Sequence, residues 1–194
     1  EYMQLLSEIL ADVHVAGVQT LVWVDNIAFV GHRDAAREAM RLFTARCQAF
    51  NVTLSDKQSD FIDGPCGEFI GIAFDTNQFS LTQRTLDKIA ASTKVILNHH
   101  SLPTFTQYAE ALGIFLFASS LLGISTAQYY YVLKFYRRKM AAIAKQQVDP
   151  DAPCRIWKSI IQDIADWSSL LLRNDPVEPT VSEKEAHVSK ATLF

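Results

Sequence analysis

The sequence predicts an α+β fold, in which antiparallel hairpins pack on helices and an all-helical region follows. Three observations carry this prediction. Residues 19–31 form a β-rich segment that turns back on itself at Asp25-Asn26, and a second β-rich segment covers residues 68–81. After Thr82 the apolar residues recur only at helical spacing. The chain therefore divides into a mixed amino-terminal part and a helical carboxyl-terminal part.

The composition is that of a globular protein. Of 194 residues, 49% are hydrophobic and 20% are charged, and 18 basic against 21 acidic side chains leave a net charge of -3. This balance argues against a protein that coats nucleic acid through its overall charge, while a local basic face is compatible with it. The longest apolar stretch, residues 111–124, is shorter than the ~18 residues that a spanning helix needs, so we expect no membrane partner.

The three cysteines, Cys47, Cys66 and Cys154, are odd in number and too far apart for the ligand spacing of a zinc site. We expect free thiols, which indicates an intracellular, reducing compartment; the nucleus and the mitochondrion both fit. The sequence opens without methionine on a segment that already has helical spacing, so we expect a fragment or a processed product.

The mixed part opens with an amphipathic helix over residues 2–14, whose aliphatic residues form one stripe. A hairpin over residues 19–31 follows, because Asp25 and Asn26 tolerate the positive φ of a type I′ turn. Asp34 is the expected N-cap of a helix that ends near Phe50.

A second hairpin follows a polar link over residues 51–60. Its first strand covers residues 68–75, its turn is Thr76-Asn77-Gln78, and its return strand covers residues 79–81. We therefore expect a mostly antiparallel sheet with helices on one face.

The helical part is expected to hold helices over about residues 83–98, 103–122, 126–146 and 155–173. Pro103 has the position of a first-turn proline, and Gly123 lies where a helix should stop. The tail is too polar to fold alone, so we expect it to be extended or disordered. The predicted divisions of the chain are residues 1–82, 83–148, 154–173 and 174–194.

Three segments of the mixed part follow one another as the motifs of a known family do. Val24-Asp25-Asn26, between apolar flanks, resembles the aromatic-x-Asp-Asp hairpin of the reverse transcriptases of retrotransposons. Residues 51–57, which end in Lys57, resemble the next motif of that family. Residues 69–75, which contain Phe69 and Gly71, resemble the Phe-Leu-Gly strand that begins the primer-gripping hairpin, with residues 79–82 as its return strand.

The resemblance extends into the helical part. Residues 104–113 resemble the Thr-x-x-x-x-x-x-x-Leu-Gly thumb segment of the family. Residues 163–167 are similar to the region before the ribonuclease H domain in DIRS-like, VIPER-like and gypsy-like elements. The resemblance covers about residues 1–175 and implies a partial polymerase palm followed by a thumb-like or connection-like helical region.

The resemblance also implies roles for particular residues. Asp25 would be a catalytic aspartate and a ligand of Mg²⁺, Asn26 would occupy the second carboxylate position, and Lys57 would lie near the phosphates of the incoming nucleotide. Phe69 and Gly71 would belong to the primer-grip-like strand. Two plainer interpretations stay open: Asp25-Asn26 is also a good hairpin turn, and Lys57 is also an ordinary solvated lysine.

The sequence departs from the family in ways that bear on activity. Asn26 is a neutral amide, which coordinates a hard cation without neutralising it. The first catalytic aspartate of the family lies on a strand upstream of the opening helix, and no such strand is in this sequence. With Asp25 as the one candidate ligand, we expect that this chain alone cannot assemble a two-metal site.

The helix over residues 126–146 interleaves basic and aromatic residues. Its basic residues are Lys134, Arg137, Arg138, Lys139 and Lys145, and five tyrosines and phenylalanines lie between residues 129 and 136. Such a face can follow a phosphate backbone and stack on bases. The alternative is an amphipathic helix with its aromatic rings in the core and a solvated basic side.

Two functions are compatible with these features. The first is a reverse-transcriptase-like palm and thumb remnant that acts as a non-catalytic structural or partner-binding component of a larger nucleic-acid-associated assembly. The second is part of an active RNA-directed DNA polymerase that a missing amino-terminal region or another chain completes. The expected partners are other protein chains, with RNA or an RNA–DNA hybrid as a further candidate that the basic helix would bind.

Overall fold

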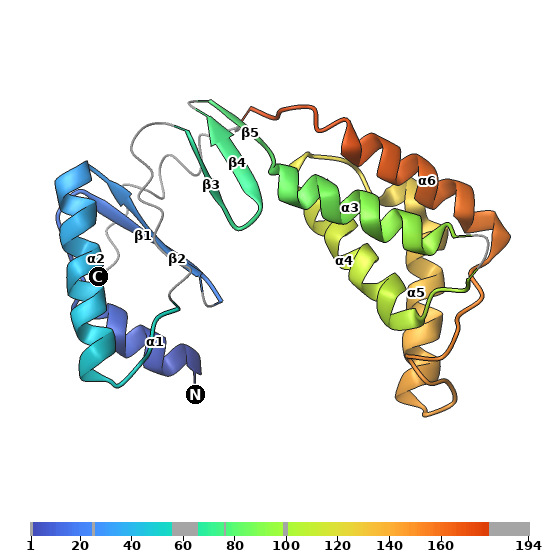
Figure 1. Cartoon of the computed structure of the whole chain (residues 1–194), viewed down its shortest axis with the longest axis horizontal. Coiled ribbons are helices and arrows are strands. Elements are labelled where there is room, and N and C mark those ends of the chain that lie inside the picture. The colour runs from blue at the N-terminus through green and yellow to red at the C-terminus, as the bar shows by residue number, and fades with distance from the viewer. Residues whose placement is uncertain (1, 25, 56–65, 76, 99–100, 179–194) are drawn as a thin grey trace. The chain divides into compact units, whose positions relative to one another are not determined.

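The computed structural model in Figure 1 describes residues 2–24, 26–55, 66–75, 77–98 and 101–178. The chain forms two compact units, residues 1–64 and residues 65–194. The described residues of both contain helices and small antiparallel sheets, which confirms the predicted α+β class.

The first unit is a hairpin that packs on two helices. Its elements in chain order are α1 (Tyr2–Leu10), β1 (Val18–Trp23), β2 (Asn26–Gly31) and α2 (Arg33–Ala49). Side chains alternate across a strand, and Ile27 and Phe29 of β2 pack against the helical core around Phe43 and Cys47. The rings of Phe29 and Phe43 lie 5.7 Å apart. The apolar stripes of α1 and α2 therefore cover one face of the hairpin.

Two predicted helix boundaries in this unit are wrong. The first helix ends at Leu10 instead of residue 14, and His32, not Asp34, is the N-cap of α2. His32 has the extended backbone of a cap residue but no side-chain bond to the helix, while Asp34 lies in the first turn. There its negative charge still interacts favourably with the positive end of the helix dipole.

The sheet of the second unit has three strands where the sequence predicted two. It consists of β3 (Gly67–Phe69), β4 (Ile72–Asp75) and β5 (Gln78–Leu81), paired in that order. Phe69 pairs with Ile72, so the chain turns at Ile70-Gly71, where φ is 45° and 85°. Asp75 pairs with Gln78, so β4 and β5 are joined by a second short turn that contains Asn77. Gln78 therefore belongs to a strand, and Thr76 lies outside the described residues.

The rest of this unit is helical, as predicted. The helices are α3 (Gln83–Ile96), α4 (Phe105–Leu121), the 3-10 helix η1 (Ala127–Tyr129), α5 (Tyr130–Ala144) and α6 (Lys158–Leu172). Thr104 caps α4 in a capping box with Gln107, so Pro103 precedes the helix and is not in its first turn. Gly123 follows the end of α4 at a φ of 64°, which confirms the predicted stop.

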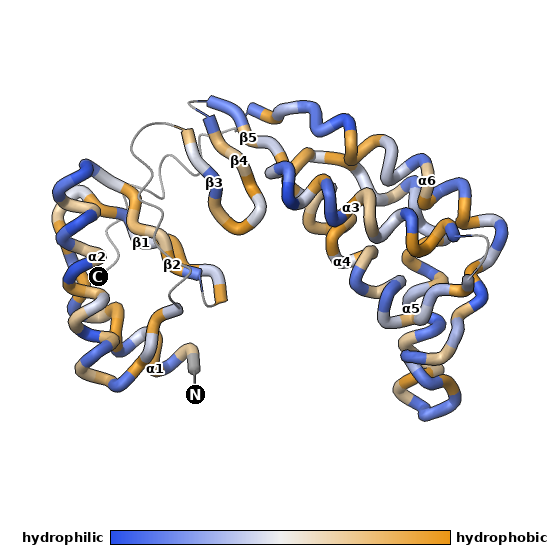
Figure 2. Tube along the Cα trace, in the orientation of Figure 1, coloured by the Kyte–Doolittle hydropathy of each residue, from blue (hydrophilic) through white to orange (hydrophobic). Residues whose placement is uncertain are grey.

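The core of the second unit lies between these helices. Figure 2 shows polar and apolar stretches alternating along them. Trp167, Ile160 and Ile164 of α6 are fully buried against apolar residues of α3, α4 and α5. The Tyr108 hydroxyl donates to the carbonyl of Val132, 3.0 Å away, which ties α4 to α5. The segment before α6 also packs here, since the Cys154 amide donates to the Pro103 carbonyl.

The segment after α6 returns to the sheet. Asn174, at a φ of 50°, accepts from the Leu81 amide at 2.7 Å and donates to the Leu81 carbonyl at 3.1 Å. Val177 exchanges two backbone hydrogen bonds with Phe79. Residues 174–177 thus occupy the free edge of β5. The sheet belongs to the same unit as the helices, whereas the sequence-based division at residue 82 grouped it with the first hairpin.

Replacing Gly71 with alanine should destabilise the second unit. A Cβ there would lie 2.8 Å from the Thr85 hydroxyl, in a backbone with φ of +85°, so we expect a loss of about 2 kcal/mol in the free energy of unfolding. Urea unfolding followed by the fluorescence of Trp157 and Trp167 measures it. Gly113→Ala is the matched control, because open space surrounds that helical position and alanine should stabilise it slightly. Equal stability of both variants would contradict the role of Gly71.

Replacing Asn174 with glycine should loosen the returning segment. Glycine keeps the positive φ but removes both side-chain bonds to Leu81, so we expect a loss of about 1–3 kcal/mol. Hydrogen exchange at the Leu81 amide should rise in parallel. Asn51→Gly, at a φ of 54° in the first unit, should leave that amide unchanged.

Candidate functional site

The tip of the β1–β2 hairpin differs by one residue from the prediction. Trp23 pairs with Asn26, so Val24 lies in the turn and Asn26 is the first residue of β2. Asn26 is half-buried, and Asp25 lies outside the described residues. The expectation of an Asp25-Asn26 turn is therefore wrong in register, because Val24 takes the first turn position.

Val24 has an unfavourable backbone conformation. Its φ is 56°, in the left-handed region, although its side chain is branched at Cβ and 62% exposed. That region costs an L-residue roughly 1–2 kcal/mol, and a branched side chain makes it an outlier. The strain adjoins Asp25, the residue to which the family resemblance gives a catalytic role. Strain of this kind gathers at functional sites.

The outer face of the hairpin is apolar and exposed. Leu21, Trp23 and Val30 point away from α1 and α2 because they alternate with the inward-facing residues of the two strands. Their exposed fractions are 46%, 59% and 51%. Within the described residues, no third strand pairs with this two-stranded sheet. Both the face and the edges are suited to contact with another strand.

The described part of the chain contains no cluster of metal ligands. No group of three histidine, cysteine, aspartate or glutamate side chains gathers there as a metal site would require. Asn26 supplies a neutral amide where a two-metal site needs a second carboxylate. Because Asp25 lies outside the described residues, the binding of Mg²⁺ stays a prediction. Lys57, the predicted phosphate ligand, lies outside the described residues.

Phe69 and Gly71, the primer-grip-like residues, lie at the β3–β4 turn. Phe69 ends β3, and Gly71 is the second turn residue. The Gly71 carbonyl accepts from the Thr82 amide and from the Thr85 hydroxyl, both at 3.1 Å. The turn is thus fixed on the first turn of α3. The joint role of this turn and the first hairpin stays a prediction.

The basic residues of α5 line a surface of the second unit. Arg137, Arg138 and Lys145 are exposed, while Lys134 and Lys139 are half-buried. The Lys134 ammonium lies 5.5 Å from the ring centre of Tyr130 and 5.7 Å from that of Tyr131. The Arg138 guanidinium lies 5.4 Å from the ring centre of Trp157. Cations and aromatic rings are therefore paired along the helix.

The aromatic residues of η1 and α5 divide between the two interpretations of the predicted helix. Tyr129 and Phe135 are buried, and Tyr136 stacks on Phe105 at 5.5 Å, as the amphipathic interpretation predicts. Tyr130 and Tyr131 are 53% and 55% exposed, as the nucleic-acid interpretation predicts. The helix therefore has an aromatic core side and an aromatic solvent side.

Three further residues of this surface escaped the sequence analysis. Trp157 packs on Phe135 at 5.3 Å, and the exposed Arg155 and Lys158 flank it at the start of α6. The sequence signal for these three residues was a basic–aromatic–basic pattern, which ten residues separate from the end of α5. We assigned it to the next helix and so separated it from α5.

The cysteines are free thiols, as expected. Burial raises the pKa of Cys47 and of Cys154, which keeps both protonated and unreactive at neutral pH. Cys66 is exposed, and its thiol donates to the Asp75 carboxylate at 2.9 Å.

The comparisons with known proteins add no relative. No family model matches the chain, and a search of curated proteins found no match. Among the described helices, none combines the length and the apolar character that crossing a membrane requires. The resemblance to reverse transcriptases therefore rests on the motifs quoted above.

Replacing Val24 with asparagine should stabilise the first unit. Asparagine tolerates the left-handed region, so we expect a gain of about 1 kcal/mol in the free energy of unfolding. Urea unfolding followed by backbone amide signals of β1 and β2 measures it. Val30→Asn is the matched control, because Val30 lies in regular strand and should lose stability through lower β propensity. A loss for Val24→Asn of the same size would contradict the strain.

Proposed function

We propose that the chain is a reverse-transcriptase-like palm and thumb portion that acts as a non-catalytic, partner-binding component of a larger nucleic-acid-associated assembly. The outer face of the β1–β2 hairpin is the observation that carries this proposal. Leu21, Trp23 and Val30 expose apolar area there, and tryptophan is among the residues most enriched in the energetic centres of protein interfaces.

The partner that best suits this face is another protein chain that adds a strand or a sheet. A two-stranded hairpin is a small sheet, and its edges carry backbone groups that an added strand can pair. The apolar outer face would then be covered by the side chains of the partner. RNA is a poorer occupant of this face, because Leu21 and Val30 offer no charge for phosphates.

The non-catalytic part of the proposal depends on the hairpin tip. Two-metal nucleotidyl transfer needs carboxylates that neutralise two divalent cations. In the sequence Asp25 is followed by the neutral Asn26, where the resemblance to reverse transcriptases would put a second carboxylate.

A primer-extension assay tests the absence of catalysis. We expect the chain alone to add no nucleotides to a primed RNA template with Mg²⁺ or Mn²⁺. Extension that Asp25→Asn abolishes would refute the non-catalytic role, because asparagine keeps the shape of the side chain and removes its charge.

Partner binding is tested by the size of the native assembly that contains the chain. Trp23→Lys should shift the chain from a large complex to its own mass in sedimentation. Leu102→Lys is the matched control, because Leu102 is 57% exposed in the second unit and should leave the complex intact. Retention of the complex by Trp23→Lys would remove the hairpin face from the interface.

A second candidate function is an active RNA-directed DNA polymerase that another region or chain completes. The strained Val24 beside Asp25 favours it, since strain next to a catalytic residue has a use in positioning. Asp25 would hold one Mg²⁺, which supplies the charge that activates the primer hydroxyl. Primer extension by the intact assembly, lost on Asp25→Asn, would support this candidate over the first.

A further inference from the structure

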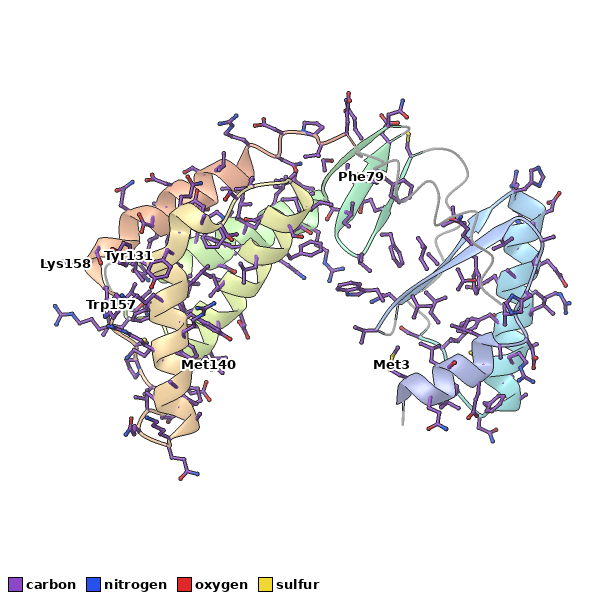
Figure 3. All side chains as sticks on the ribbon, turned by 180° about the vertical axis from the view of Figure 1, so that it is seen from behind. Met3, Phe79, Tyr131, Met140, Trp157 and Lys158 are labelled. Carbon is purple, nitrogen blue, oxygen red and sulfur yellow. The ribbon has the colours of Figure 1, made fainter. Side chains whose placement is uncertain are left out.

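We infer that the exposed and half-buried rings and cations of α5 and the start of α6 form a binding platform for single-stranded nucleic acid. The platform consists of Tyr130, Tyr131, Lys134, Arg137, Arg138, Trp157 and Lys158. The inference deepens the nucleic-acid-associated part of the proposed function and rests on it. Figure 3 shows Tyr131, Trp157 and Lys158 on the same side of the helical unit.

The tyrosine pair supplies faces for bases. The rings of Tyr130 and Tyr131 lie 5.4 Å apart at an angle of 71°, and each side chain is more than half exposed. Neighbouring Tyr129 and Phe135 fill the core, so the exposed pair is not needed to pack the helix. Stacking of a base on such a ring contributes roughly 1–3 kcal/mol.

The cations lie where they would meet the phosphates. Lys134 reaches over both tyrosine rings, and Arg138 covers Trp157 one helical turn further on. In the described part of the chain, no ion pair engages Lys134, Arg137 or Arg138. These charges are therefore available for a strand of phosphates beside the stacked bases.

Local charge separates this surface from the rest of the chain. Residues 126–158 contain seven basic and two acidic side chains, in a chain whose net charge is -3. The attraction for phosphate is thus concentrated on α5 and the segment that follows it. A polyanion would be drawn to this surface although the protein as a whole is acidic.

The exposed rings favour a single strand over a duplex. In a duplex the faces of the bases are stacked on one another, so only the phosphate backbone would meet the platform. Unpaired bases can stack on Tyr130 and Tyr131 while their phosphates meet Lys134 and the two arginines. RNA and DNA single strands share this chemistry.

Fluorescence anisotropy of the full chain with labelled oligonucleotides tests the inference. The probes are a single strand of about twelve nucleotides, as RNA and as DNA, and a duplex of the same sequence. We expect tighter binding of the single strands, with log Kd depending on log salt by about 0.7 per phosphate contacted. Tighter binding of the duplex would overturn the platform while leaving nucleic-acid association in place. Binding of none of the probes would overturn the platform and the association of this chain with nucleic acid, while the partner-binding role of the hairpin face would still stand on its own test.

Paired variants separate stacking from charge. Tyr130→Ala with Tyr131→Ala should weaken single-strand binding about tenfold or more, whereas phenylalanine at both positions should keep it within about twofold. Lys134→Gln with Arg138→Gln should lower the salt slope by about 1.4. Arg84→Gln with Lys88→Gln, on the exposed side of α3, is the charge control and should leave the slope unchanged. Equal binding by the alanine and phenylalanine variants would refute stacking, and circular dichroism checks that each variant is folded.

Discussion

The helical unit depends on the contacts that the buried side chain of Trp167 makes. Its indole is fully buried, lies parallel to the Tyr129 ring at 4.3 Å, and meets the edge of Phe115 at 5.4 Å. Its Nε1 group donates to the Ser119 hydroxyl at 2.8 Å, so the polar atom is satisfied inside the core. One side chain of α6 thereby joins α4 and η1. Since α5 continues directly from η1, this contact also fixes where the exposed tyrosines begin.

The first unit is organised in the opposite way. Its sheet has two strands, one covered face and one bare apolar face, and its turn contains a strained valine. A small core around Phe43 and Cys47 holds the hairpin on α1 and α2. The core of the first unit is therefore smaller than the core of the helical unit. An exposed apolar face on a small sheet is expected where another protein chain packs on that face.

Much of the fold could be predicted from the sequence, because the hydrophobic periodicity and the residues that end helices were clear. The helical spacing after Thr82 and the stop at Gly123 were strong local signals. The register of the first turn could not be predicted from the sequence. Asp25-Asn26 are the residues best suited to a turn there, but the cross-strand pairing places Val24 in the turn. The Ile70-Gly71 turn was missed because a β-rich run with one glycine reads as a continuous strand.

The candidate sites were predictable to different degrees. The alternation of rings and charges placed the basic face on α5, but periodicity could not divide the tyrosines between core and solvent, because neighbouring residues such as Tyr129 and Tyr130 differ completely in burial. Trp157 joins α5 through a tertiary contact with Arg138, across a loop. No spacing rule in the sequence encodes that contact, so it emerges only from the fold.

The return of residues 174–177 to β5 has a consequence for how the protein is made. Leu81 and Asn174 are 93 positions apart, and the edge of the sheet is complete only when both are present. During synthesis from the amino terminus, the edge of β5 stays unpaired until the residues after α6 have left the ribosome. Closing so long a loop is slow, and an open strand edge is a site of mispairing in the meantime. The pairing of residues 174–177 with β5 therefore ends the period in which the nascent sheet can pair with a wrong strand.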